Sequence, residues 1–300
     1  MNRRSFLKLG GVSLLSSFLL PRLGKGDKVQ QTAPSYWIGG KYFVQDTVNT
    51  DDLPERIWAR IDGSWHVYPV RELPSEYIDW SINRRLVRLE DMLVGIMPSC
   101  YDGPHSAAVA TYSRFGRGDS EFKVNNAIKG MGFIPKQERI ADVIQQLKDT
   151  QDASMTAKVQ VLIDNYSDRD LWDMTCQGSL ELYTTPSFET HSFTNQMRNP
   201  VSTVVFLDVP SYEFRAVAKL IHAKDPSVSE VERARAEYIN LVHTYFHSGP
   251  TDNIACIYYV IEVFDNSPGT YKPGSRIVPE LDKKAAVRDP RSQNHRTIAY

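Results

Sequence analysis

Residues 178–223 constrain the fold of this chain more than any other stretch. A strand-like segment at 179–185 leads through a Pro-Ser turn into a short helical segment at 188–198. Residues 201–209 follow and are almost entirely apolar and rich in β-branched side chains, a composition typical of a strand buried on both faces. A further strand with mixed alternation is expected at 212–223. The stretch therefore predicts neighbouring strands of one sheet, with a short helix after the first of them.

Three features of this stretch carry a resemblance to a known family. They are the loop Tyr183-Thr184-Thr185, the helix end Asn199-Pro200 and the apolar strand that follows. The proline ends the helix because the residue before a proline is disfavoured in the α region. In this order the features resemble the centre of the pyridoxamine 5'-phosphate oxidase-like, FMN-binding split barrel. The resemblance extends over residues 135–266.

The order of elements predicts an α+β fold, a split β-barrel with flanking helices preceded by a β-rich region. We expect a signal and linker at 1–30 and a β-rich region of unassigned role at 31–133. The split-barrel domain is expected at 134–268, and a C-terminal arm that lies over a partner subunit at 269–300.

Periodicity locates the helices of the barrel domain. Apolar residues at i, i+3, i+4 and i+7 from Ile140 predict a helix at 135–150. Ser229 followed by Glu232 matches a capping box, so a second helix should begin there and run to about residue 247. Apolar runs predict the remaining strands of the domain at 157–164, 171–176 and 254–264, the last of which would close the barrel.

The region before the barrel domain gives one strong local signal. Asp62-Gly63 stands between two alternating runs at 57–70, which predicts a β-hairpin. Residues 86–97 fit a strand or a buried helix equally well, because periodicity does not separate the two for a short apolar run. Residues 101–132 are rich in glycine and are expected to form loops between short strands.

The N-terminus resembles an export signal. Arg3 and Arg4, within Asn-Arg-Arg-Ser-Phe-Leu-Lys, resemble a twin-arginine motif, and a modest apolar run follows at 9–20. The run is shorter than the roughly 20 apolar residues that a transmembrane helix needs. The resemblance implies export to the periplasm or the cell surface through the twin-arginine machinery, with or without cleavage of the signal. It also favours a tightly held cofactor, because proteins on this route are exported already folded.

Charge and cysteine content exclude two classes of protein. The formal net charge of −1 removes the electrostatic reason to expect nucleic acid as a partner. Cys100, Cys176 and Cys256 are widely spaced and form no CxxC pattern, so the chain is not built on a disulfide framework.

The resemblance places a cofactor site in the loop after Tyr183. The residues that would bind the cofactor are Thr184, Thr185, Thr190, His191 and Ser192. The basic residues with which the family holds the FMN phosphate are absent here, since the matching positions are Thr190-His191-Ser192. The pocket would hold FMN, a deazaflavin, haem or nothing. Alternatively, these hydroxyl groups only cap the helix and satisfy turns.

No metal site is expected. His243 and His247 have the i, i+4 spacing of two metal ligands, but they lie opposite the apolar stripe of their helix and have no acidic partner between them. A solvated helix face is the better interpretation.

Two functions are consistent with these patterns. By resemblance, the chain is an exported, homodimeric FMN-type oxidoreductase that acts on a small-molecule substrate. The cofactor does the chemistry in such a site, so no catalytic side chain is nominated. The alternative is a non-catalytic exported binding protein that holds haem or another apolar ligand in the same barrel, and the missing basic residues favour it.

Overall fold

The computed structural model describes residues 36–96, 102–115, 117, 119–247, 249–269 and 273–280. The chain divides into two compact units, Met1–Thr32 and Ala33–Tyr300, and every described residue belongs to the second. The twin-arginine motif and residues 281–300 of the predicted arm lie outside the described residues.

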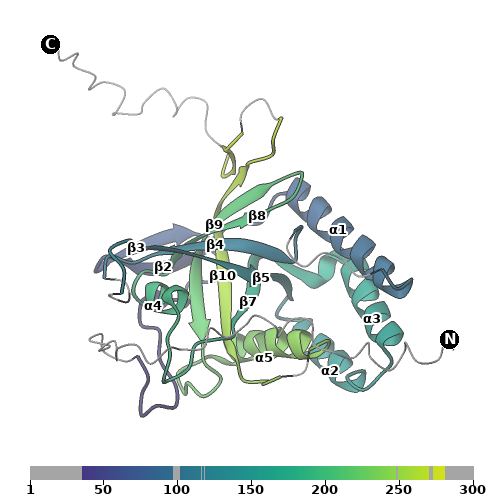
Figure 1. Ribbon diagram of the computed structural model, residues 1–300, viewed down its shortest axis with the longest axis horizontal. Coiled ribbons are helices and arrows are strands. Elements are labelled where there is room, and N and C mark those ends of the chain that lie inside the picture. The colour runs from purple at the N-terminus through teal and green to yellow at the C-terminus, as the bar shows by residue number, and fades with distance from the viewer. Residues whose placement is uncertain are drawn as a thin grey trace, which may run out of the picture. The chain divides into compact units, whose positions relative to one another are not determined.

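One antiparallel sheet dominates the described residues (Figure 1). Its eight strands are β4 (Ser106–Tyr112), β5 (Val124–Gly130), β6 (Gly132–Pro135), β7 (Trp172–Glu181), β8 (Val201–Phe206), β9 (Tyr212–Ile221), β10 (Ile254–Asp265) and β11 (Ser275–Val278). They follow the order β5-β4-β8-β9-β10-β7-β6, and β11 pairs with β10. The sheet is strongly curled into a half-barrel, which confirms the predicted α+β class and the split barrel.

The course of the chain makes this sheet curl. β5 and β6 lie at opposite ends of the strand order, yet the single residue Met131 joins them. β6 pairs with β7 through Gly132 opposite Gly178 and Phe133 opposite Gln177, whereas β5 pairs with β4. No pairing joins β5 to β7 in the part of the chain that the structure describes. The barrel is therefore closed beside Met131 and split along β5.

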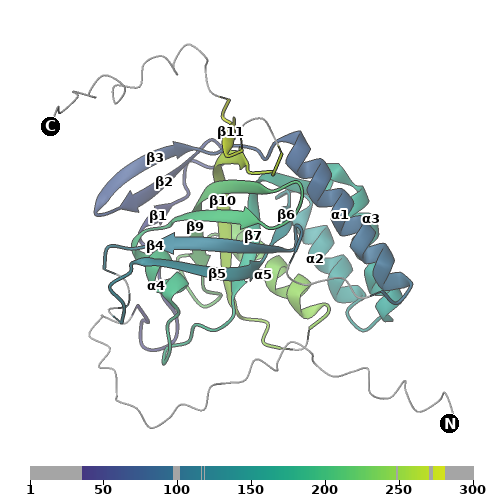
Figure 2. The ribbon, with the colours of Figure 1, turned by 45° about the horizontal axis from the view of Figure 1, so that its top comes forward.

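A second, three-stranded sheet precedes the barrel (Figure 2). It contains β1 (Val48–Asn49), β2 (Arg56–Ile61) and β3 (Ser64–Pro69). Asp62 and Gly63 join β2 to β3 with positive φ angles of 48° and 90°, the left-handed conformations that a two-residue hairpin turn requires. The predicted hairpin is confirmed.

Five α-helices flank the main sheet among the described residues. They are α1 (Ser75–Leu93), α2 (Ile140–Asp149), α3 (Met155–Ser167), α4 (His191–Arg198) and α5 (Glu230–Thr244), with a short 3-10 turn at Arg169–Leu171. The capping box at the start of α5 is present, with Ser229 Oγ accepting from the Glu232 N–H and the Glu232 carboxylate accepting from the Ser229 N–H. Residues 86–93 of the ambiguous stretch belong to α1 and are therefore helix, and α1 and α3 run side by side (Figures 1 and 2).

The strand expected at 157–164 is wrong, because these residues belong to α3. Ser154 caps this helix by accepting a hydrogen bond from the Ala157 N–H at 3.3 Å, and only Val159, Asn165 and Tyr166 of the helix are buried. The helix therefore presents one stripe to the protein, as a surface helix does. The Ser154 cap before the apolar run indicates a helix, whereas the run alone does not distinguish helix from strand.

Three strands also differ from expectation. The two strands expected at 171–176 and 179–185 form one continuous strand, β7. β8 alternates between half-buried and buried residues, so only one of its faces lies in the core. β10 does not close the barrel but lies inside the sheet between β9 and β7, which explains why eight of its twelve residues are buried.

The sheet also crosses the boundary expected between residues 133 and 134. β4 and β5 come from the β-rich region, and β4 pairs along its length with β8. β4 consists mostly of small residues, so its own sequence gives a weak strand signal and its place depends on pairing with β8. Beyond it, β11 pairs with β10 of the same chain, within the arm expected at 269–300.

We expect His222 to make the stability of this core depend on pH. Its imidazole is buried against Trp37 and Phe43, with ring centroids 5.4 and 5.6 Å away, and its Nδ1 accepts a hydrogen bond from the Lys224 N–H. Burial lowers the pKa of His222 below its usual value of 6.5. The unfolded chain therefore binds a proton more readily than the folded chain, and protonation favours unfolding.

We expect the free energy of unfolding to decrease as the pH falls below about 6.5. Urea unfolding at pH 7.5 and pH 5.5 measures this decrease. In His222→Gln the decrease should be smaller, because glutamine does not titrate. An unchanged decrease in that variant would show that other groups cause it.

Candidate functional site

A groove opens where β5 and β7 separate, and it is the candidate site. Its volume is about 400 Å³, within the range of roughly 300–1,000 Å³ typical of small-molecule sites. The residues that line it are Arg117, Asn125, Ala127, Ile128, Lys129, Gly130, Leu180, Glu181, Leu182, Tyr183, Phe188, Thr190, His191 and Ser192. They come from the segment between β4 and β5, from β5, the end of β7, the loop after β7 and the start of α4.

The split of the barrel explains this position. The register in which Gly132 pairs with Gly178, continued along both strands, brings Lys129 opposite Glu181. These two side chains still touch, with Lys129 Nζ 2.6 Å from Glu181 Oε2. Past them the backbones separate without hydrogen-bonded pairing in the described residues. The ion pair thus marks the end of the groove where the strands come together.

The walls of the groove are largely apolar. Ile128, Tyr183 and Phe188 all line it and are unusually exposed, at 56%, 74% and 49% of their surface. Leu182 is exposed as well. Large apolar side chains gathered around one groove are typical of a ligand-binding or interaction surface.

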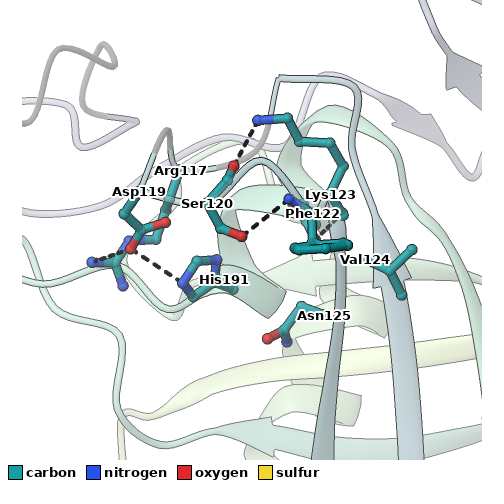
Figure 3. A pocket seen from close by; sticks show the side chains of 9 residues that line it. Arg117, Asp119, Ser120, Phe122, Lys123, Val124, Asn125 and His191 are labelled. Carbon is teal, nitrogen blue, oxygen red and sulfur yellow. Dashed lines mark hydrogen bonds and ion pairs between the residues drawn. The ribbon is translucent and has the colours of Figure 1, made fainter.

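A charged cluster lies at the other end of the groove, beside a small cavity that Figure 3 shows. Asp119 lies between two basic side chains, with its Oδ2 atom 3.3 Å from His191 Nε2 and 3.4 Å from Arg117 Nη2. The Arg117 guanidinium also lies over the Phe188 ring, 5.1 Å from its centroid. A second, water-sized cavity of about 10 Å³ adjoins this cluster and shares Arg117, Asn125 and His191 with the groove.

The structure brings most of the predicted site residues to the groove. Thr190, His191 and Ser192 line it. Thr184 does not line it but lies next to it, with its Oγ1 atom 3.2 Å from Thr190 Oγ1. Thr185 is exposed and exchanges a hydrogen bond with Ser187 instead.

The polar groups of these residues are engaged in local structure. Thr190 Oγ1 accepts from the Phe193 N–H and caps α4, and the Thr184 hydroxyl accepts from the Thr190 N–H. Ser192 Oγ accepts from Asn125 Nδ2 at 2.9 Å. These contacts support the interpretation that the hydroxyl groups cap the helix and satisfy turns.

Among the described residues, the groove has no lysine or arginine that is free of a carboxylate partner. A phosphate dianion is held by charge-assisted donors, but both lysine and arginine side chains that line the groove are paired with carboxylates, Lys129 with Glu181 and Arg117 with Asp119. The residues present therefore do not support an FMN phosphate site.

The cap at Thr190 predicts a cost that is independent of any ligand. Thr190→Ala should lower the free energy of unfolding by about 1 kcal/mol, because α4 loses the acceptor for the Phe193 N–H. Thr185→Ala is the matched control, since Thr185 is exposed and caps nothing. Chemical denaturation of both variants without ligand checks this, and equal stability of the two would contradict it.

Four charged residues of the site were not found from the sequence. Lys129 and Glu181 meet only because the sheet curls, and Arg117 and Asp119 lie in the glycine-rich segment that was interpreted as loops. The only sequence signal was indirect, a lysine in an otherwise neutral strand.

His243 lies on α5 and His247 lies just after its end, since the helix stops at Thr244 rather than at about residue 247. The rings of His243 and His247 lie 5.1 Å apart, and the described residues contain no group of three His, Cys, Asp or Glu side chains that could hold a metal ion. No helix within the described residues is long and apolar enough to cross a membrane.

Comparison with known proteins leaves the family open. No protein-family model matches the chain, and no curated protein matches it. Among solved structures, the chain is similar to a crystal structure of HupZ of Group A Streptococcus, with 14% sequence identity and a TM-score of 0.33. The match covers 66% of this chain and 97% of the HupZ chain. At this identity and TM-score, the similarity supports no conclusion about ligand, activity or partner.

Proposed function

We propose that this chain is a non-catalytic binding protein that holds a flat, largely apolar ring ligand, the class that includes haem, in the groove between β5 and β7. The observation that carries the proposal is the groove itself, which is about 400 Å³ in volume, has apolar walls and bears charged groups at its two ends. An apolar pocket with a few convergent polar groups is the usual form of a small-molecule site.

Haem fits the charged end of the groove near α4. Histidines that bind metal usually donate their other ring N–H to a carboxylate, which fixes the orientation of the ring. The Nε2 atom of His191 has such a partner in Asp119. The other ring nitrogen, Nδ1, would therefore be the ligand to the haem iron. Bound haem would supply an iron centre, and these residues would hold and orient it.

The ion pairs and hydrogen bonds of the groove residues disfavour a flavin oxidoreductase as the leading function. The groove offers no uncommitted cation for the FMN phosphate among the described residues, and the hydroxyl groups expected to replace it already cap α4 and its loop. A binding role needs neither a phosphate site nor a catalytic side chain.

The test is a titration of the purified protein with hemin and with lumiflavin, a flavin ring without phosphate. We expect saturable binding of at least one of them at one ligand per chain, followed by the hemin Soret band or by lumiflavin fluorescence. Ala127→Trp should abolish this binding, because Ala127 lines the groove. Asn126→Trp should not, because Asn126 is exposed on the same strand and does not line the groove. Absence of saturable binding of both ligands would overturn the proposal.

His191→Ala separates haem from other ligands. For hemin, the variant should shift the Soret maximum and weaken binding by at least tenfold. His66→Ala is the control, since His66 is an exposed histidine on β3, far from α4 in sequence and outside the groove lining. Equal spectra for both variants would show that His191 does not contact the iron.

We further propose that the chain is exported by the twin-arginine route and forms a homodimer. The motif at Arg3 and Arg4 supports the first part, and the family resemblance of residues 135–266 supports the second. Replacing both arginines with lysine should keep the protein in the cytoplasm, and sedimentation of the purified protein measures its oligomeric state. Unimpaired export of the lysine variant, or a monomer at all concentrations, would contradict the respective part.

A further inference from the structure

The function proposed above assigns no ligand contact to the ion pair Lys129–Glu181 at the inner end of the groove. Only 7% and 4% of the two side chains are exposed, and Lys129 Nζ lies 2.6 Å from Glu181 Oε2. Both residues nevertheless line the groove. A ligand that enters the groove therefore meets a buried cation and a buried anion side by side.

The pair has hydrogen-bonding capacity beyond its mutual contact. An ammonium has three N–H donors, and a carboxylate has two acceptor oxygens. The hydrogen bond of Lys129 Nζ among the described residues is the one to Glu181 Oε2. A ring ligand that covers the pair excludes water from it, and buried polar groups that are left without partners weaken binding. The best ligand is one that replaces the excluded water with its own donor and acceptor.

We infer that the Lys129–Glu181 pair selects ring ligands whose edge carries a carbonyl group next to an N–H group, as in a lactam or an imide. The carbonyl oxygen accepts from Lys129 Nζ, and the N–H donates to the Glu181 carboxylate. A carboxylate edge is attracted by the lysine but repelled by the glutamate. A cationic edge is attracted by the glutamate but repelled by the lysine. A hydrocarbon edge satisfies neither group. The inference rests on the proposed function, because it requires a ring ligand in the groove, and it involves no phosphate.

Two probes that differ by one methyl group test the inference. Lumiflavin has an imide edge with a single N–H, and 3-methyllumiflavin carries a methyl group on that nitrogen. We expect the wild-type protein to bind lumiflavin at least tenfold more tightly than 3-methyllumiflavin, as measured by fluorescence titration.

A double variant shows whether the ion pair causes this preference. Lys129→Met/Glu181→Leu replaces the pair with apolar side chains of similar volume, a change that proteins often tolerate, whereas removal of one partner leaves a buried charge. The double variant should bind the two flavins with equal affinity. Its near- and far-ultraviolet circular dichroism should match the wild type, which shows that it is folded.

The outcomes separate the inference from the proposed function. Equal affinity of the wild type for the two flavins, or an unchanged preference in the double variant, overturns the inference. If hemin or lumiflavin still binds and Ala127→Trp blocks it, the proposed function stands. Absence of binding by every probe overturns both.

Discussion

Arg235→Met should lower the free energy of unfolding by about 3–5 kcal/mol, the usual effect of removing one partner of a buried ion pair. Arg235 Nη2 lies 2.7 Å from Asp173 Oδ2, and the two side chains are only 11% and 15% exposed. Arg235 Nη1 also donates to the Tyr259 hydroxyl at 3.1 Å. The arginine thus joins α5 to β7 and β10, and its loss leaves the Asp173 carboxylate buried without its cation.

Urea unfolding of three variants tests this expectation. Lys148→Met is the matched control, because Lys148 pairs with Glu237 of the same helix α5 at 2.6 Å but both side chains are about half exposed. A surface pair of this kind contributes roughly 0–1 kcal/mol. The double variant Arg235→Met/Asp173→Leu should recover most of the loss, since it leaves no unpaired charge. If Arg235→Met costs no more than Lys148→Met, the pair does not stabilise the fold.

Gly178→Ala should lower the free energy of unfolding by about 1–3 kcal/mol, the usual cost of overpacking a core. A Cβ atom at Gly178 would lie 2.8 Å from both Cδ1 and Cγ1 of Ile239 and 3.2 Å from Cγ1 of Ile134. Gly178 lies in the middle of β7, between β6 and β10, so the backbone has no room to move away. The glycine is therefore required for the close packing of α5 on the sheet.

Gly132 provides the control for this substitution. It pairs directly with Gly178, yet a Cβ atom there would meet nothing within 4 Å. Gly132→Ala should therefore change the stability by less than about 0.5 kcal/mol. In a background of Ile239→Ala, which removes both crowding atoms, Gly178→Ala should become nearly neutral. A cost for Gly178→Ala that is the same in both backgrounds would show that Ile239 is not the cause.

Local signals predicted well those elements whose ends are set by nearby residues. The hairpin at Asp62-Gly63 depends only on the turn, and the start of α5 depends only on Ser229 and Glu232. α4 ends at Arg198, directly before Asn199-Pro200, where the sequence predicts its end. Each of these features consists of groups within about one helical turn, so a short window of the sequence contains every residue that determines it.

Elements whose form depends on distant partners were predicted less well. The apolar run at 157–164 was interpreted as a strand although it forms α3, because short apolar runs suit either structure until packing selects one. β4 gave a weak signal because its strand is made largely by pairing with β8. The alternating burial of β8 depends on which face of the sheet is covered, and the run itself does not show this.

The sequence by itself determined the α+β class, the split barrel, the turns and caps, and the loop around Thr190 and His191 as a place to look for a ligand. Only the tertiary structure decided that the hydroxyl groups there cap α4, and that the groove lies between β5 and β7. It also brought Lys129 to Glu181 and Arg117 beside His191, forming the two charged ends of the groove. The physical reason is that a ligand site requires groups from distant strands and loops to meet, and their meeting depends on the curl of the whole sheet.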